Sequence, residues 1–236
     1  KNRLANIGIQ TDVPENFIQQ VEAILEYLCA GDVMQVNLSR AWHIEFAKPP
    51  NVAEIWQNLH EANPNPFAAS LYLGGQNWIL STSPERLVRV KADHIDMRPI
   101  AGTRPRGTNP EEDANLQAEL QKHPKELAEH IMLIDLIRND LGRVCAVGSV
   151  QVDELMTVEK YAHVQHLVSN VCGKLAQPTD VWSILRAVFP GGTITGCPKV
   201  RCMEIIDELE ATPRGAYTGS LGYVDWSGQL DSNILI

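Results

Sequence analysis

Two Gly-Thr segments of the sequence have residue types that suit the binding of a small, dense anion. The segment DMRPIAGTRPRG at 96–107 places arginines beside Gly102-Thr103, and FPGGTITGCPKV at 189–200 places Gly192-Thr193 ahead of a helix predicted to begin at Pro198. Free backbone N–H groups and the positive end of a helix favour a bound carboxylate. The second segment lacks the GxxxxGK[ST] spacing of a nucleotide loop. An ordinary glycine-rich helix entry is the alternative interpretation.

The charge balance limits the kinds of partner. There are 20 Lys and Arg residues against 29 Asp and Glu residues, a net charge of −9 without a basic block, which excludes nucleic-acid binding as a main function. An acidic protein that binds an anion must concentrate its cations locally, and Arg98, Arg104 and Arg106 are candidates. A solvated loop face is the alternative for these arginines.

Cysteine usage and hydropathy indicate the compartment. No apolar run approaches the length of a membrane span, and no signal-peptide pattern is present. The five cysteines have no CxxC spacing, which is typical of reduced thiols. We therefore expect a cytoplasmic protein without membrane contact.

Hydrophobic periodicity predicts the elements that position the two segments. An amphipathic helix is predicted over 14–30, because Pro14 suits its first turn and Gly31 its end. A two-faced strand follows over 34–46. Further predictions are helices at 51–63, 124–141 and 180–188, strands at 67–74, 77–82, 86–98, 215–225 and 230–236, and a loop at 105–115. Strands with clustered helices predict an α+β class with largely antiparallel sheets, as one domain over 1–236.

Six blocks of the sequence together resemble the chorismate-utilising enzymes, which include anthranilate, aminodeoxychorismate, isochorismate and salicylate synthases. The blocks are the two Gly-Thr segments, GDVMQVNLSR (31–40), STSPERLV (81–88), ELAEHIMLIDLIRNDLGRV (126–144) and AHVQHLVS (162–169). The resemblance runs from about Phe17 to Ile236. It implies a chorismate-binding fold, a two-sheet β-sandwich flanked by helices, with the active site in the central cleft.

Glu126 and Glu129 are spaced i, i+3, so both carboxylates lie on one side of the predicted helix. Paired surface glutamates are common, and spacing alone does not predict a metal site. The resemblance implies that they hold Mg²⁺ beside the ring carboxylate of chorismate, with further metal-binding glutamates beyond Ile236. On the same ground we expect a fragment that lacks the N-terminal region and the C-terminal end of the family.

The resemblance also implies individual catalytic and binding roles. Glu85 matches the general acid/base that assists loss of the carbon-4 hydroxyl, and His166 matches the histidine beside that hydroxyl. A salt bridge between Glu85 and Arg86 and a satisfied core histidine are the alternatives. The implied substrate-binding residues are Ala101, Thr103, Gly192 and Thr193.

Gln35 and Ala101 bear on the reaction. Isochorismate and salicylate synthases have a lysine base at the position of Gln35, and a neutral amide cannot activate water. An aminating enzyme is therefore favoured, with ammonia from a glutamine amidotransferase subunit. Ala101 replaces the lysine of the PIKGT motif, which favours anthranilate synthase, whereas Asn37, SPERL and FPGGTITG favour aminodeoxychorismate synthase. We expect 4-amino-4-deoxychorismate as product, with anthranilate synthase or a non-catalytic chorismate-binding module as alternatives.

Overall fold

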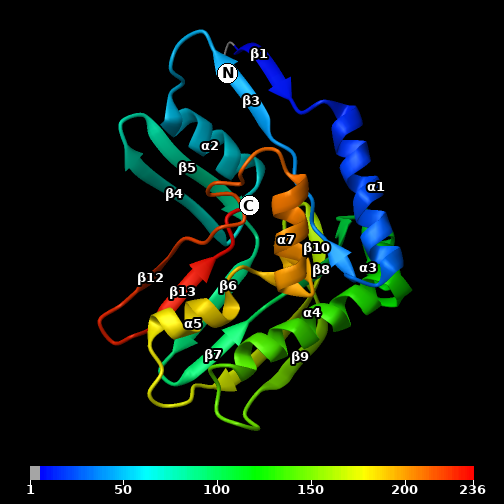
Figure 1. Ribbon diagram of the computed structural model, residues 1–236, viewed down its shortest axis with the longest axis vertical. Helices are drawn as coiled ribbons and strands as arrows, with labels where there is room; N and C mark the ends of the chain where they lie inside the picture. The colour runs from blue at the N-terminus through cyan, green and yellow to red at the C-terminus, as the bar shows by residue number, and fades with distance from the viewer. Residues whose placement is uncertain (1–5) are drawn as a thin grey trace.

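All strand pairs in the computed structural model, which describes residues 6–236, are antiparallel. The largest sheet has seven strands in the order β12-β13-β6-β7-β10-β8, with β9 also paired to β10 (Figure 1). Its strands are β6 (Arg86–Lys91), β7 (His94–Met97), β8 (Ile100–Pro105), β9 (Gln151–Lys160), β10 (Val164–Lys174), β12 (Gly222–Val224) and β13 (Leu230–Asn233).

Three two-stranded sheets complete the β structure of the described chain. They pair β1 (Asn6–Thr11) with β3 (Trp42–Phe46), β2 (Gln35–Val36) with β11 (Gly196–Cys197), and β4 (Phe67–Gly74) with β5 (Asn77–Ser83). The β1–β3 and β4–β5 pairs lie in the upper half of Figure 1, near α2 (Val52–Ala62). The predicted α+β class with antiparallel sheets is confirmed.

Helix ends follow the local signals in the sequence. Helix α1 (Pro14–Ala30) ends at Gly31, whose left-handed backbone (φ 80°) lets its N–H bond back to Leu28. Asn51 caps α2 by accepting the N–H of Ala53. The remaining helices are α3 (Pro110–Lys122), α4 (Pro124–Gly142), α5 (Val181–Val188), α6 (Gly192–Thr195) and α7 (Lys199–Leu209). The helices predicted at 14–30, 51–63, 124–141 and 180–188 are confirmed.

Several of the element predictions were wrong in part. Of the strand predicted at 215–225 only β12 forms, and the strand predicted at 230–236 ends at Asn233. The strand predicted at 86–98 is a hairpin, β6 and β7, because the chain turns at Ala92 with φ 58°. The loop predicted at 105–115 ends at Asn109, which caps α3. The run at 34–46 is interrupted between β2 and β3, since the N–H of Asn37 donates to Thr195 and that of Ser39 to Glu210 instead of a strand partner. Strands β9 and β10 were not predicted.

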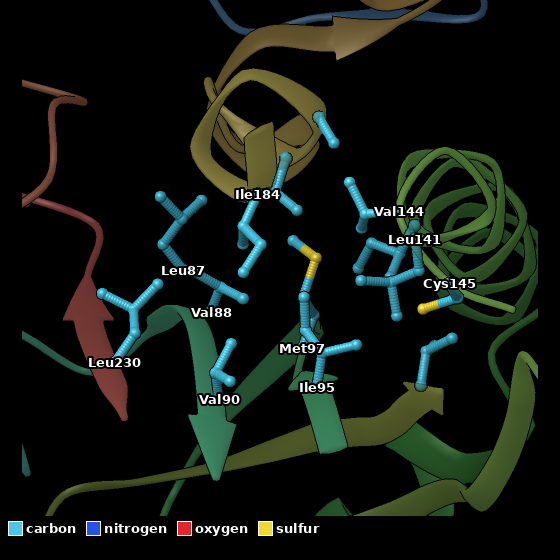
Figure 2. Packing of buried hydrophobic residues seen from close by; sticks show 14 of the residues in the cluster. Leu87, Val88, Val90, Ile95, Met97, Leu141, Val144, Cys145, Ile184 and Leu230 are labelled. Carbon is cyan, nitrogen blue, oxygen red and sulfur yellow. The ribbon is translucent and has the colours of Figure 1, made fainter. Parts of the chain in front are cut away.

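The main core lies between the seven-stranded sheet and helices α4 and α5 (Figure 2). Leu87, Val88 and Ile95 of the sheet are at most 1% exposed, and they pack in the same cluster as Leu141 of α4 and Ile184 of α5. Burying each such side chain contributes roughly 1.5–3 kcal/mol to stability. This packing holds α4 across the sheet, so that its N-terminal half lies against β8.

None of the helices within residues 6–236 combines the length and the apolar character that a bilayer crossing demands.

Candidate active site

The candidate site surrounds β8, a strand that pairs only with β10 within the described residues. The β8–β10 register places Thr103 opposite His166, and Thr103 Oγ1 lies 2.8 Å from His166 Nδ1. His166 is only 7% exposed. Burial lowers its pKa, while the nearby Glu159 carboxylate acts in the opposite direction. The structure therefore brings Thr103 and His166 together, with a largely neutral imidazole at pH 7.

Gly102 lets helix α4 approach β8 closely. Its φ of +84° is in the left-handed region, and a Cβ there would lie 2.8 Å from Leu120 Cδ1 and 2.9 Å from Glu126 Oε2. Glu126 thus packs directly against β8 at Gly102. The first Gly-Thr segment is therefore part of strand β8.

Glu126 and Glu129 each accept a hydrogen bond from another part of the chain. Arg104 Nη1 donates to Glu126 Oε1 at 3.1 Å, and Gln35 Nε2 donates to Glu129 Oε1 at 2.8 Å. Within residues 6–236 no group of three or more His, Cys, Asp or Glu side chains is arranged to hold a metal. Two carboxylates do match the number that Mg²⁺ commonly takes from a protein, so the donor chemistry fits part of its coordination sphere.

Gln35 is positioned by the short β2–β11 pairing, in which it lies opposite Cys197. Its own carbonyl oxygen Oε1 is buried and accepts no hydrogen bond from the described residues. The next polar residue of this segment, Asn37, donates from Nδ2 to the carbonyl of Thr193 at 2.8 Å. The segment 35–37 therefore connects Glu129 of α4 to the second Gly-Thr segment.

Glu85 lies between the two Gly-Thr segments. It is 6% exposed, and burial raises its pKa to about 7, although the Thr193 hydroxyl and the backbone at Ile100 partly offset this effect. The contact with Thr193 is loose, since Thr193 Oγ1 forms no hydrogen bond of regular geometry within residues 6–236. The alternative salt bridge is excluded, because Arg86 pairs with Asp231 at 2.8 Å.

The remaining predicted residues have small side chains. Ala101 is 3% exposed and supplies only a methyl group between Ile100 and Gly102. Gly192 begins α6, and a Cβ there would lie 2.3 Å from Leu136 Cδ2. The contacts around β8 thus link all nine predicted site residues into one region.

The arginines of the first segment are already neutralised. Arg98 pairs with Glu154 and Glu159, Arg104 pairs with Glu119 and Glu126, and Arg106 pairs with Asp113. These arginines therefore form neither a free cationic cluster nor a purely solvated loop face, the two interpretations that the sequence allowed. The prediction that they concentrate positive charge for an anion was wrong, because acidic residues distant in sequence fold against them.

Two residues beside His166 were missed by the sequence analysis. The β9–β10 register places Glu159 opposite His166, and the ring of Tyr161 packs on the imidazole with centroids 5.4 Å apart. A cavity of about 210 Å³ is lined in part by Ile100, Glu159 and Tyr161. The sequence signal for these residues is their period-two spacing, which is typical of one face of a strand. The pairing of β9 with β10 is what brings that spacing beside His166.

Comparison with known proteins connects this geometry to a family. The model of the chorismate binding enzyme family matches residues 4–236. Aminodeoxychorismate synthase component 1 of Bacillus subtilis is 52% identical over 94% of this chain and 47% of its own length. Anthranilate synthase component 1 of a Synechocystis strain is 48% identical over 94% of this chain and 44% of its own length.

Solved structures agree with the sequence comparisons. Anthranilate synthase component I from Streptococcus pneumoniae superposes with a TM-score of 0.88 at 37% identity, covering 99% of this chain and 51% of that chain. The chain therefore spans about half the length of these relatives. With a family model that covers nearly every residue, and relatives about half identical to it, the chain belongs to the chorismate binding enzymes.

Proposed function

We propose that the protein carrying this chain aminates chorismate at carbon 4 to 4-amino-4-deoxychorismate, with ammonia from a glutamine amidotransferase subunit. Relatives named for this reaction and for anthranilate synthesis match at similar identity, so family membership leaves the product open. The observation that carries amination is Gln35. Its amide is committed to Glu129 and has no proton to lose near neutral pH, so it cannot activate water as a base.

Glu85 is the proposed general acid. A carboxyl with a pKa of about 7 is still protonated in a large fraction of molecules at neutral pH, and it can give its proton to the carbon-4 hydroxyl. The C4–O bond then breaks and water leaves, while ammonia forms the C4–N bond and releases one proton. Ala101 has no nucleophilic atom, so ammonia attacks directly and no covalent enzyme intermediate forms at that position.

The remaining residues bind and orient chorismate in this proposal. The backbone N–H groups at Gly192-Thr193 and the Thr103 hydroxyl donate to its carboxylates, and neutral His166 lies near the departing hydroxyl. Glu126 and Glu129 would hold Mg²⁺, which supplies a Lewis acid for the ring carboxylate when bound. Binding Mg²⁺ requires Gln35 and Arg104 to release or share these carboxylates.

Product analysis tests the proposal. The full-length protein is incubated with chorismate, ammonium and Mg²⁺, and the product is separated by chromatography before and after addition of a lyase that converts 4-amino-4-deoxychorismate to p-aminobenzoate. We expect p-aminobenzoate only after the lyase is added. Anthranilate as the sole product would exclude the proposed reaction.

Anthranilate synthesis is the second candidate, and Ala101 favours it. Without a lysine at this position ammonia could add directly at carbon 2 while the carbon-4 hydroxyl leaves as water, and loss of pyruvate then yields anthranilate. An Ala101→Lys variant sharpens the assay. If the wild-type protein makes 4-amino-4-deoxychorismate, we expect the new amine at position 101 to trap chorismate. An adduct detected by mass spectrometry would place carbon 2 of chorismate beside position 101.

A further inference from the structure

We propose that Tyr161 is a positioning residue for His166: its ring packs against the imidazole, and its hydroxyl holds Glu159 in place beside it. The inference rests on the proposed role of His166 near the departing hydroxyl. None of the motifs that carry the family resemblance assigns a role to Tyr161.

His166 is held on three sides by neighbours of different chemistry. Thr103 of β8 contacts Nδ1 at 2.8 Å. The ring of Tyr161 lies against the imidazole with an interplanar angle of 60°, a tilted arrangement that aromatic pairs favour. Glu159 lies opposite on β9. Thr103 restrains one nitrogen, and Tyr161 packs on the ring and restrains its plane.

Glu159 is the charged group that faces His166, and its two oxygens are occupied by other donors. Tyr161 Oη donates to Oε2 at 2.7 Å, and Arg98 Nη2 donates to Oε1 at 2.5 Å. Burial acts to raise the pKa of Glu159, but these two bonds outweigh it and keep the carboxyl ionised. A carboxylate bound in this way is less available to charge His166, because its negative charge is shared with Arg98 and the Tyr161 hydroxyl.

The Tyr161 hydroxyl remains a donor across the working pH range. Burial, followed by the bond to Glu159, raises its pKa to about 12. The charged and titratable groups that face His166 are thus Glu159 of β9 and Tyr161 after β9, with Arg98 behind Glu159, while β8 contributes the neutral Thr103.

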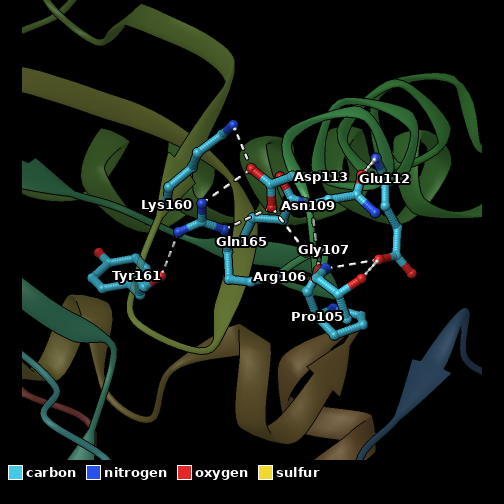
Figure 3. Close-up of polar contacts among 10 residues, drawn as sticks. Pro105, Arg106, Gly107, Asn109, Glu112, Asp113, Lys160, Tyr161 and Gln165 are labelled. Atoms are coloured by element: carbon cyan, nitrogen blue, oxygen red, sulfur yellow. Dashed lines mark hydrogen bonds and ion pairs between the residues drawn. The ribbon is translucent and has the colours of Figure 1, made fainter.

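The backbone of Tyr161 is fixed by the Asp113 cluster, which consists of Arg106, Gly107, Asp113 and Lys160 (Figure 3). Asp113 of α3 is 7% exposed and accepts from Arg106 Nε at 2.7 Å and from Lys160 Nζ at 2.9 Å. Arg106 in turn donates from Nη1 to the carbonyl of Tyr161 at 3.0 Å. Helix α3, the end of β8 and the end of β9 are therefore tied together at the residue that packs on His166.

The cluster keeps its charge at any ordinary pH. The guanidinium of Arg106, the N–H of Gly107 and the Lys160 ammonium hold the pKa of Asp113 well below its usual range. Because the carboxylate accepts from two cations and a backbone N–H, removing its charge would leave Arg106 without its main anchor. Tyr161 is thus held from its backbone side by a permanent ionic network and from its hydroxyl side by Glu159.

The test separates the ring of Tyr161 from its hydroxyl in the full-length protein. Tyr161→Leu removes both, Tyr161→Phe keeps the ring, and Tyr223→Phe is the matched control at an exposed tyrosine of β12. The first readout is the tautomer and pKa of His166 from long-range ¹H–¹⁵N NMR without chorismate. The second is the separation of kcat from KM.

We expect Tyr161→Leu to lower kcat about tenfold with KM changed less than about threefold, since misplacing a proton-transfer group affects the chemical step more than binding. Tyr161→Phe should restore kcat to within about threefold of wild type. It should also raise the pKa of His166, because Glu159 loses a donor and its charge acts more strongly on the imidazole. Tyr223→Phe should change neither readout.

Glu159→Gln provides a second route if Tyr161→Leu does not fold. It removes the carboxylate opposite His166, so the pKa of His166 should fall below its wild-type value. The inference would be overturned if both Tyr161 variants had the kcat of the wild type and if the tautomer and the pKa of His166 were unchanged in both. A raised KM at constant kcat would also overturn it, since Tyr161 would then bind substrate. The NMR result does not depend on which product forms, so it stands apart from the test of the proposed function.

Discussion

The two Gly-Thr segments have the same dipeptide but different structures and surroundings. Gly102-Thr103 lies in strand β8, where Gly102 has a left-handed backbone and Thr103 bonds to His166. Gly192-Thr193 opens the short helix α6, and the Thr193 hydroxyl has no regular hydrogen bond within the described residues. Glu85 contacts both regions, through the backbone at Ile100 and the Thr193 hydroxyl.

The difference indicates that the Thr103 hydroxyl already has a partner in the protein, whereas the Thr193 hydroxyl has none of regular geometry within the described residues. Thr103 has its partner in the protein, so its hydroxyl positions His166. Thr193 has a buried hydroxyl with unused hydrogen-bonding capacity, and such groups are uncommon unless a ligand or water satisfies them. Substitutions at matched positions of the two segments, and at Glu85 between them, test this interpretation.

Glu85→Gln should have the largest effect. Removing a general acid lowers kcat by roughly 10²–10⁴-fold, and kcat of the wild type should fall as pH rises through about 7, where Glu85 loses its proton. Steady-state kinetics over pH 5–9 would measure both. A variant that retains activity within about threefold of wild type would remove Glu85 from the chemistry.

The same variant should change the pH dependence of stability. The pKa of Glu85 is raised from 4.5 to about 7 in the folded state, so the native state binds its proton more tightly than the unfolded chain. Its stabilising effect is complete below pH 4.5 and is lost as pH rises through 7, a difference of roughly 3 kcal/mol at 1.36 kcal/mol per pKa unit. Urea unfolding at pH 5 and pH 8 should show this loss for the wild type and a smaller one for Glu85→Gln.

Gly102→Ala should destabilise the protein more than Gly192→Ala. At Gly102 the new side chain meets both a left-handed backbone and the atoms of Leu120 and Glu126, at a cost of about 2 kcal/mol or more. At Gly192 the backbone is ordinary, and only the end of Leu136 must move, which costs about 1 kcal/mol. Urea midpoints of the two variants give the comparison. A larger loss for Gly192→Ala would show that α6, not β8, is the more tightly packed segment.

Thr103→Ala and Thr193→Ala should have the smallest effects, and of different kinds. Thr103→Ala removes a hydrogen bond of buried His166 and should lower stability by about 1 kcal/mol, with Thr103→Ser restoring it. Thr193→Ala should leave stability nearly unchanged but raise the pKa of Glu85, since the Thr193 hydroxyl lowers it. Urea unfolding at pH 6 measures the stability loss of Thr103→Ala. The pH profile of kcat measures the pKa shift of Glu85 in Thr193→Ala. An identical response of both variants would contradict the contrast between the segments.

Local elements were largely predictable because their signals lie within a few residues. Pro14 and Gly31 set the ends of α1, and the alternation in 67–74 matched β4 (Phe67–Gly74). Errors arose where a long-range partner changed the local outcome. Asn37 and Ser39 are not part of the expected strand, because their backbone N–H groups donate hydrogen bonds to Thr195 and Glu210. Such contacts join residues more than 150 positions apart, and periodicity does not report them.

The sequence by itself determined the family, the fold class and the candidate residues, since ordered motifs and short-range patterns record them directly. Tertiary structure alone decided which side chains meet. It neutralised the arginines at 98, 104 and 106 with distant carboxylates, joined Gln35 to Glu129, and placed Tyr161 on His166. The physical reason is that ion pairing, burial and strand register depend on distances in space, and these arise only when separate segments pack on a common core.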